Sequence, residues 1–291
     1  MASSAVNVPT RGGRLQASVR EVLKRPLLVI AIVLILFLSF VAVVGPSLAP
    51  HGSEELVTGR FESPSGKHWF GTDELGRDVL TRVIHGSRLS LTIGVVASVV
   101  GVSLGSLIGS ITGYWGGKVD LLVQRSIDAL QAFPVIILAL AIVAVLGSSP
   151  KTVMIAAVIA FIPSSTRVVR SAVLETKERD FVTAAVTIGA GDLRILFRHI
   201  IPQVMAPYFV LISLFVGVAI LLESGLSFLG VGPPPPAVSW GKMLGGESRI
   251  YIESAPWALL WPAFFLTLVV YAFNLLGDSL RDMLDPRLRG T

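Results

Sequence analysis

The chain has 291 residues, of which 53% are hydrophobic and 15% are charged, and its mean hydropathy is +0.75. Soluble domains are about one quarter charged, so this composition excludes an ordinary soluble domain and indicates a protein of the lipid bilayer. The net charge is +5, but the basic residues form no stripe with interleaved aromatic residues, which argues against nucleic-acid binding. The absence of cysteine excludes disulfides and thiolate metal sites.

The first predicted membrane span follows a polar, basic segment over residues 1–26. The apolar run Leu27–Val44 has 18 residues, which as a helix extend about 27 Å, close to the hydrocarbon thickness. Small residues at Ser47–Ala49 would suit signal cleavage, but a secretory signal has a shorter apolar region of about 7–15 residues. The pattern therefore favours a retained helix, followed by an external loop over Gly45–Arg88 that is rich in proline and glycine.

Five further apolar segments predict an all-α integral membrane protein with six transmembrane helices. This pattern divides the chain into an N-terminal segment (1–26), a first helix with its external loop (27–88) and a core domain (89–291). Within the core, residues 170–203 and 223–256 are the long loops. The five spans are Leu89–Gly113, Val119–Leu146, Thr152–Val169, Val204–Leu222 and Trp257–Leu276.

The distribution of basic residues predicts the orientation. Six spans place both termini on one side of the membrane, and 16 of the 24 Lys and Arg residues fall on that side. Cytoplasmic loops carry the excess of Lys and Arg, so both termini and the 170–203 loop are predicted to be cytoplasmic. The loops 45–88 and 223–256 are then external.

Small residues recur every fourth position along the second span. Residues four apart share one helix face, so together they form a smooth stripe that lets another backbone approach closely. The stripe predicts helix packing, either within this chain or against a different subunit. Its members are Ala97, Gly101, Gly105, Gly109 and Gly113.

A few charged residues lie near the membrane, and none of them forms a recognisable catalytic site. Asp120 and Asp128 share one face of the third span, where Arg125 could pair with Asp128, and they favour ion pairing at the interface over a proton relay. No G-x-x-x-x-G-K-[ST] motif occurs, so the chain cannot bind and split a nucleotide by the P-loop route. The four histidines lack metal-ligand spacing, and no metal site is expected.

The polar segment Glu178–Pro202 interrupts the apolar second half of the chain. Its small residues, followed by a glycine, a basic–apolar stretch and a proline, predict a short helix, a turn and a second helix that returns to the bilayer. A solvated basic loop is the simpler alternative. Because the segment is predicted to be cytoplasmic, we expect it to contact a partner in the cytoplasm.

Within this segment, Ala184-Ala185, Gly189 and Ile201-Pro202 resemble the cytoplasmic EAA loop of importer-type ABC transporter permeases. Four other motifs in the same order make the chain similar to the second ("C") permease subunit of dipeptide, oligopeptide and nickel importers. They are FGTDELGRD at 70–78, DALQAFP at 128–134, LSFLGVG at 226–232 followed by SWG at 239–241, and LGDSLRDMLDPRLR at 276–289.

The resemblance implies a permease of the bacterial cytoplasmic (inner) membrane that works with several partners. These are a second homologous permease subunit, two cytoplasmic ATPase subunits that bind ATP and Mg²⁺, and an external substrate-binding protein. This chain would itself hold no cofactor and would not be an enzyme. Peptides or related small solutes are the implied substrates, and no residue of the sequence can be assigned to substrate binding.

The resemblance also implies that Asp180–Gly189 is the coupling helix, which sits in a cleft of an ATPase subunit. Thr183 stands where the family name leads us to expect Glu, so we expect docking to depend on the small face formed by Ala184, Ala185 and Gly189. The residues expected to couple are Asp180, Phe181, Thr183, Ala184, Ala185, Gly189 and Pro202.

Two other classes of function remain as alternatives. A stand-alone secondary transporter driven by protons or sodium would show an inverted repeat and acids at the midplane, and neither is found in the sequence. A membrane scaffold or receptor without transport is the second alternative.

Overall fold

The computed structural model describes residues 23–245 and 252–284. Most of the predicted N-terminal segment 1–26, and the final residues of the predicted motif at 276–289, lie outside these ranges. The described residues form helices joined by loops, with only two isolated β-bridges. The long helices are α2 (Pro26–Leu48), α3 (Val79–Trp115), α6 (Pro150–Lys177), α9 (Ile201–Phe228) and α11 (Trp257–Leu284).

These five helices are long and apolar enough to cross a membrane. A sixth span arises if α4 (Gly117–Gln131) and α5 (Val135–Leu146) are taken together, but the two are bent by 88°. The continuous helix predicted over Val119–Leu146 is therefore wrong in shape. Pro134 lies at the break, where its ring disfavours a helical conformation of Phe133 and its missing N–H removes a helix hydrogen bond.

Several helices extend beyond their predicted spans. α3 begins ten residues before the predicted Leu89, because the Asp78 carboxylate accepts a hydrogen bond from the Thr81 N–H at 2.8 Å and caps the helix. α9 continues to Phe228 and includes Glu223, which was predicted to lie in the external loop. Because α2 continues to Leu48 and α3 already begins at Val79, the external loop between them is shorter than the predicted 45–88.

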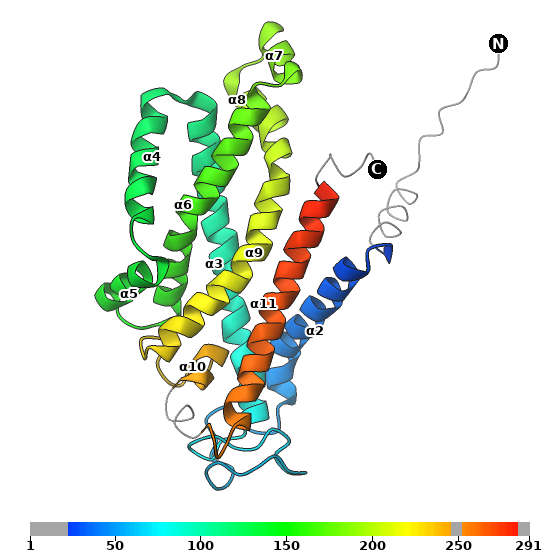
Figure 1. Cartoon of the computed structure of the whole chain (residues 1–291), viewed down its shortest axis with the longest axis vertical. Helices are drawn as coiled ribbons and strands as arrows, with labels where there is room; N and C mark the ends of the chain where they lie inside the picture. The colour runs from blue at the N-terminus through cyan, green and yellow to red at the C-terminus, as the bar shows by residue number, and fades with distance from the viewer. Residues whose placement is uncertain (1–22, 246–251, 285–291) are drawn as a thin grey trace, which may run out of the picture.

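α3, α6 and α9 pack together as the centre of the molecule, and α11 lies between α9 and α2 (Figure 1). The glycine stripe of α3 faces α6: a Cβ at Gly105 would lie 2.7 Å from the Ile162 carbonyl oxygen, and one at Gly101 would lie 3.0 Å from that of Val158. This close approach is an intramolecular contact of the kind that small residues permit between membrane helices.

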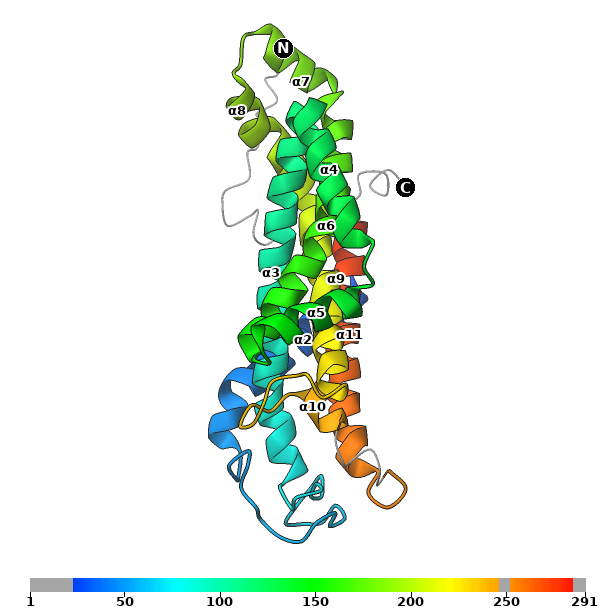
Figure 2. The same ribbon diagram turned by 90° about the vertical axis from the view of Figure 1, so that its left-hand side faces the viewer.

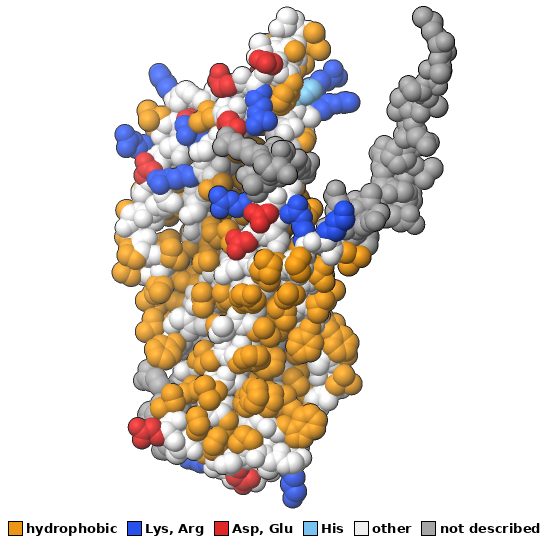
Figure 3. Space-filling model, turned by 45° about the vertical axis from the view of Figure 1, so that its right-hand side comes forward, with side chains coloured by type: hydrophobic (Ala, Val, Ile, Leu, Met, Phe, Trp, Pro, Cys, Tyr) orange, Lys and Arg blue, Asp and Glu red, His pale blue; other side chains and the backbone are white. Residues whose placement is uncertain are grey.

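The two ends of the bundle differ in what they carry. α7 (Asp180–Thr187) and α8 (Asp192–Ile195) form one end and project beyond the level at which α2 starts and α11 ends, while the loop before α3 and the short helix α10 (Trp240–Leu244) lie toward the other end (Figures 1 and 2). Hydrophobic side chains cover the broad zone between charged residues at the two ends (Figure 3). The Lys and Arg excess makes the α7–α8 end cytoplasmic.

Candidate coupling surface at the cytoplasmic end

α7 is a short helix whose two ends are defined by local chemistry. Asp180 supplies an acidic residue in its first turn, which favours the positive end of the helix dipole. At the other end Gly189 has φ +79°, and the N–H groups of Gly189 and Ala190 donate to the carbonyls of Val186 (2.9 Å) and Ala185 (3.0 Å). This pair of hydrogen bonds is a Schellman cap, in which glycine tolerates the left-handed conformation at little cost.

The two neighbouring alanines of α7 face in opposite directions. Ala185 is only 5% exposed and packs with Val182 against the protein, whereas Ala184 is exposed. The predicted small docking face of Ala184, Ala185 and Gly189 is therefore wrong for Ala185. Gly189 is exposed, and a Cβ there would meet no atom within 4 Å, so its backbone conformation rather than close packing favours glycine.

Several large apolar side chains are exposed at this water-facing end. Ile188, immediately after α7, is 85% exposed, and Phe197 lies on the π-helical turn Leu196–Ile200 that follows α8. We call these exposed apolar side chains the coupling surface; they are Phe181, Val186, Ile188, Leu193 and Phe197. Exposed apolar groups that gather on one water-facing surface are a mark of a protein interaction site.

Of the other residues predicted to couple, Asp180 and Thr183 are exposed on α7, next to Phe181 of the coupling surface. Pro202 lies apart from them, in the first turn of α9. It lines a cavity of about 690 Å³ between the cytoplasmic ends of α6, α9 and α11, together with Thr176, Arg179 and Leu284. Pro202 is therefore placed beside this cavity and not on α7.

One polar contact attaches α8 to α3, and a second joins α3 to the end of α6. The Tyr114 hydroxyl, near the end of α3, donates to the Asp192 carboxylate at 2.9 Å. The Lys177 ammonium, at the end of α6, donates to the Tyr114 carbonyl at 2.7 Å and lies 5.5 Å from the centre of its ring. A force on α7 and α8 would thus reach α3 and α6 through defined bonds.

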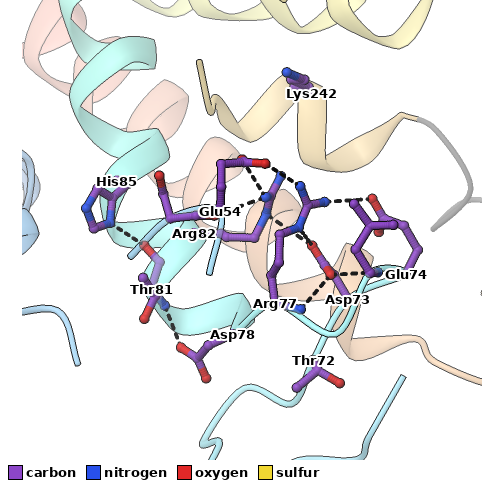
Figure 4. A network of polar contacts seen from close by, with 12 residues as sticks. Glu54, Thr72, Asp73, Glu74, Arg77, Asp78, Thr81, Arg82, His85 and Lys242 are labelled. Carbon is purple, nitrogen blue, oxygen red and sulfur yellow. Dashed lines mark hydrogen bonds and ion pairs between the residues drawn. The ribbon is translucent and has the colours of Figure 1, made fainter. Parts of the chain in front are cut away.

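The motif FGTDELGRD builds a closed polar network at the external end (Figure 4). The Asp73 carboxylate accepts from the N–H groups of Leu75 and Arg77 (both 2.9 Å) and from the Arg77 Nε (2.8 Å). Glu54 bridges Arg77 and Arg82 at 2.8 and 2.9 Å. Asp73, Arg77 and Arg82 are all buried, so this network joins the external loop to the start of α3.

The motif SWG at 239–241 is likewise packed into the external end. Trp240 is fully buried, and its indole N–H donates to the Val83 carbonyl at 2.9 Å. The Ser239 and Ser227 hydroxyls donate to the buried Glu223 carboxyl at 2.6 and 2.7 Å. We name this network and its Trp240 neighbourhood the external cap; its core residues are Glu54, Asp73, Arg77, Arg82, Glu223, Ser239 and Trp240.

Charged residues of α4 pair with α6. Arg170 donates to Asp120 from Nε and Nη2, both at 2.6 Å, and Arg167 donates to Asp128. The predicted pairing of Asp128 with Arg125 is wrong, because the arginine of the neighbouring helix binds that carboxylate. Among the described residues, no three His, Asp or Glu side chains cluster as a metal site would require.

Known proteins match this chain over most of its length. The family model described as "Binding-protein-dependent transport system inner membrane component" matches residues 105–290. The chain belongs to this family. It is a multi-pass inner-membrane permease subunit, and such subunits are not enzymes. Membership in this family excludes the stand-alone secondary transporter and the scaffold considered above.

Individual relatives of this permease carry transport names. The dipeptide transport system permease protein DppC of Alkalihalophilus pseudofirmus is 42% identical over 93% of this chain and 89% of its own. A putative peptide transport system permease protein of Brucella suis is 42% identical, over 93% and 91% of the two chains. The glutathione transport system permease protein GsiD of Pectobacterium atrosepticum is 40% identical, over 78% and 75%.

A solved structure shows the same fold. The MetNI methionine ABC transporter, in an inward-facing conformation, matches with a TM-score of 0.58 at 16% identity, over 70% of this chain and 96% of that chain. The fold of this permease is therefore that of an importer-type ABC permease.

Sequence reasoning missed the apolar members of the coupling surface beyond α7. Leu193 and Phe197 are four residues apart, as are Arg194 and Arg198. This spacing places an apolar stripe beside a basic stripe on one short helical segment, and the pattern was available in the sequence. That the stripe remains exposed follows only from the packing of Ile195, Leu196 and Ile200 into the protein.

Proposed function

We propose that this permease, with a second homologous permease subunit, forms the path through which an ATP-driven importer moves peptides or related small solutes. The names of its relatives, which include dipeptide, peptide and glutathione permeases at about 40% identity, support peptides as the solute. Two cytoplasmic ATPase subunits supply the energy, and an external binding protein delivers the solute.

Coupling takes place through the Asp180–Gly189 helix and the rest of the coupling surface. The observation that carries this proposal is Ile188, a large apolar side chain 85% exposed at a water-facing end. Burying such a side chain against a partner contributes about 1.5–3 kcal/mol. Coupling then depends more on the apolar surface buried against the partner than on the Glu whose expected position Thr183 occupies. The small residues Ala184 and Gly189 leave room for a partner between the larger side chains.

ATP hydrolysis can move the membrane helices because the docked segment is bonded to them. Closure of the ATPase subunits displaces α7 and α8, and the Tyr114–Asp192 and Lys177–Tyr114 contacts transmit this displacement to α3 and α6. The permease alternates between states open to either side, which nucleotide and loaded binding protein stabilise to different extents.

The test is purification of the complex, followed by uptake into liposomes. The native chain should co-purify with ATPase subunits and support ATP-dependent uptake of a labelled dipeptide. Ile188→Asp should weaken ATPase association about tenfold or more, because the apolar contact is lost and a charge must be desolvated.

Leu56→Asp provides the matched control. Leu56 is an exposed apolar residue at the external end, so its substitution should leave ATPase association unchanged. Equal loss in both variants would contradict the coupling surface, and a native chain that purifies without any ATPase subunit would contradict the proposed function.

A further inference from the structure

Two adjoining cavities lie beside α3 toward the external end of the molecule. The first, of about 380 Å³, lies between Ser53, His85 and Arg88 and the loop at 236–238 that precedes α10. The second, of about 330 Å³, lies between α2 and α3 and is lined mainly by apolar side chains such as Val43 and Val95. Arg88 and Thr92 line both cavities. We call the two together the α2–α3 groove, with a polar part and an apolar part.

The apolar part of the groove follows from the way α2 and α3 cross. The two helices touch near their external ends, where a Cβ at Gly45 would lie 2.7 Å from Cγ2 of Ile84. From this contact toward the cytoplasmic end, α2 leans away from α3 (Figure 1). Val95 in the groove and Val99, one turn further along α3, are both exposed. An apolar track therefore continues from the groove toward the middle of the bilayer.

Arg88 lies at the external boundary of the hydrocarbon layer. On α3, the predicted apolar span begins at Leu89, directly after Arg88. On α2, the predicted apolar run ends at Val44, next to the groove residue Val43. Two boundaries that are read from separate segments thus meet at one level. Lipid phosphates lie just outside the hydrocarbon layer, and the long side chain of an arginine can extend toward them.

Arg88 has no anionic partner within the described part of the chain. No ion pair or hydrogen bond joins its guanidinium to another described residue. The described residues that line the groove include no Asp or Glu. Glu54, which follows Ser53, is bonded to Arg77 and Arg82 at 2.8 and 2.9 Å. A cation beside an apolar groove, without an acid of its own, favours an anion from outside the chain.

We propose that the α2–α3 groove binds one phospholipid of the outer leaflet, with its phosphate at Arg88 and an acyl chain along the apolar part. The planar guanidinium can donate two parallel hydrogen bonds to a phosphate group. The Ser53 hydroxyl, in the same part of the groove, supplies a neutral donor. The acyl chain would cover Val43 and Val95 and fill the space that α2 leaves beside α3.

A helix of another permease subunit suits this groove less well. Membrane helices approach closely through small residues, and the glycine stripe of α3 is already used against α6. The side of α3 that lines the groove carries the larger Leu91, Val95 and Val96. A helix in the groove would also have to bring an acid to Arg88. A phospholipid supplies the negative charge and a flexible apolar chain in one molecule.

Lipid binding to the complete transporter, stripped of lipid in mild detergent, tests the proposal. Three probes are compared by the rise in thermal midpoint: dioleoyl-phosphatidylglycerol, dioleoylglycerol, which has the same chains without the phosphate, and inorganic phosphate. We expect saturable stabilisation by the phospholipid alone. Arg88→Gln should weaken its apparent affinity about tenfold or more, because charge-assisted hydrogen bonds are lost. Arg88→Lys, which keeps the charge, should weaken it less.

Arg60→Gln is the matched control, because Arg60 is an exposed basic residue of the same external loop and does not line the groove. Its phospholipid affinity should equal that of the native protein. Val95→Trp, which fills the apolar part, should weaken phospholipid binding without changing any charge, and it replaces Arg88→Gln if the latter fails to assemble.

Photo-crosslinking identifies the occupant of the groove. A photo-reactive phenylalanine analogue in place of Val95 should attach to phospholipid, and adding Arg88→Gln should reduce this attachment. The same analogue in place of Leu107, which is exposed further along α3, should attach to lipid equally with and without Arg88→Gln.

Three results would overturn the proposal. Equal phospholipid affinity in the native, Arg88→Gln and Val95→Trp proteins would leave no specific site. Equal stabilisation by inorganic phosphate would show an anion site without a lipid. Attachment of the analogue at Val95 to the second permease subunit would make the groove a subunit interface. None of these measurements depends on solute uptake, so their outcome is separate from that of the proposed function.

Discussion

The external and cytoplasmic ends of this permease differ in the side chains that they bury and expose. At the external cap, buried charges such as Asp73, Arg77 and Arg82 find their partners within the chain. At the coupling surface, apolar side chains such as Ile188 and Phe197 remain in water. The first end pairs most of its buried charged atoms within the chain, and among the described residues Arg82 Nε and Glu223 Oε2 are left without a hydrogen bond. The second end lacks the apolar contacts that a partner would supply. Buried polar groups need fixed partners, and exposed apolar groups gain free energy from new ones.

The cap also explains why motifs that identify the family need not contact solute. FGTDELGRD and SWG supply the turn glycines, the charges and the buried tryptophan that join the external loop and α10 to α3. The proposed coupling helix α7, in contrast, is held at the end of the bundle by a small apolar cluster that includes Val182 and Ala185, and the polar link from Tyr114 reaches only α8. Its position can therefore respond to a partner more readily than the cap can.

The largest effect is expected from Asp73→Ala in the external cap. This substitution leaves Arg77 and Arg82 buried with one carboxylate fewer, and breaking such a pair costs about 3–5 kcal/mol. We expect a sharp fall in the thermal midpoint and in the yield of folded protein in mild detergent. Glu55→Ala, an exposed acid of the same loop, should change the free energy of unfolding by about 1 kcal/mol or less. Similar losses in both variants would show that the cap is not a closed network.

A smaller effect is expected at the coupling helix from Gly189→Ala. The residue would be held at φ +79°, which costs an L-residue about 1–2 kcal/mol. Because α7 is at the end of the bundle, the cost should appear as loosening of α7, measured by amide hydrogen exchange, and as weaker ATPase association. Gly191→Ala is the matched control: Gly191 has φ −70° and equally open space around it. Equal behaviour of the two variants would contradict the cap geometry of α7.

The smallest effect concerns Lys242, which lies beside the external cap. Burial lowers the pKa of Lys242, an effect that the nearby Glu54 opposes and Arg82 and Arg77 reinforce. The charged form is thus penalised in the folded protein. Just below the ordinary lysine pKa, near 10.4, the unfolded chain binds more protons than the folded chain, so stability should rise with pH there.

Lys242→Met should remove this rise, and it also removes the hydrogen bond that Lys242 Nζ donates to the Ala237 carbonyl at 2.9 Å. Since Lys242 is partly exposed, solvent screening should keep the difference well below about 1 kcal/mol. The measurement is the thermal midpoint of both proteins across the pH range from neutral to about 10.5. A native chain whose stability falls faster with pH than that of the variant would contradict the stated sign.

The sequence by itself determined the membrane class, the orientation and the positions of the long helices, because hydrophobic length and basic loops are local properties read along the chain. It also located α7, whose first acidic residue and closing glycine are local signals. Only the tertiary structure decided which residues meet across helices. It paired Asp128 with Arg167 in place of Arg125, bent the third span at Pro134, and turned Ala185 inward while leaving Ile188 in water. These outcomes depend on contacts between segments far apart in the chain, which no local pattern contains.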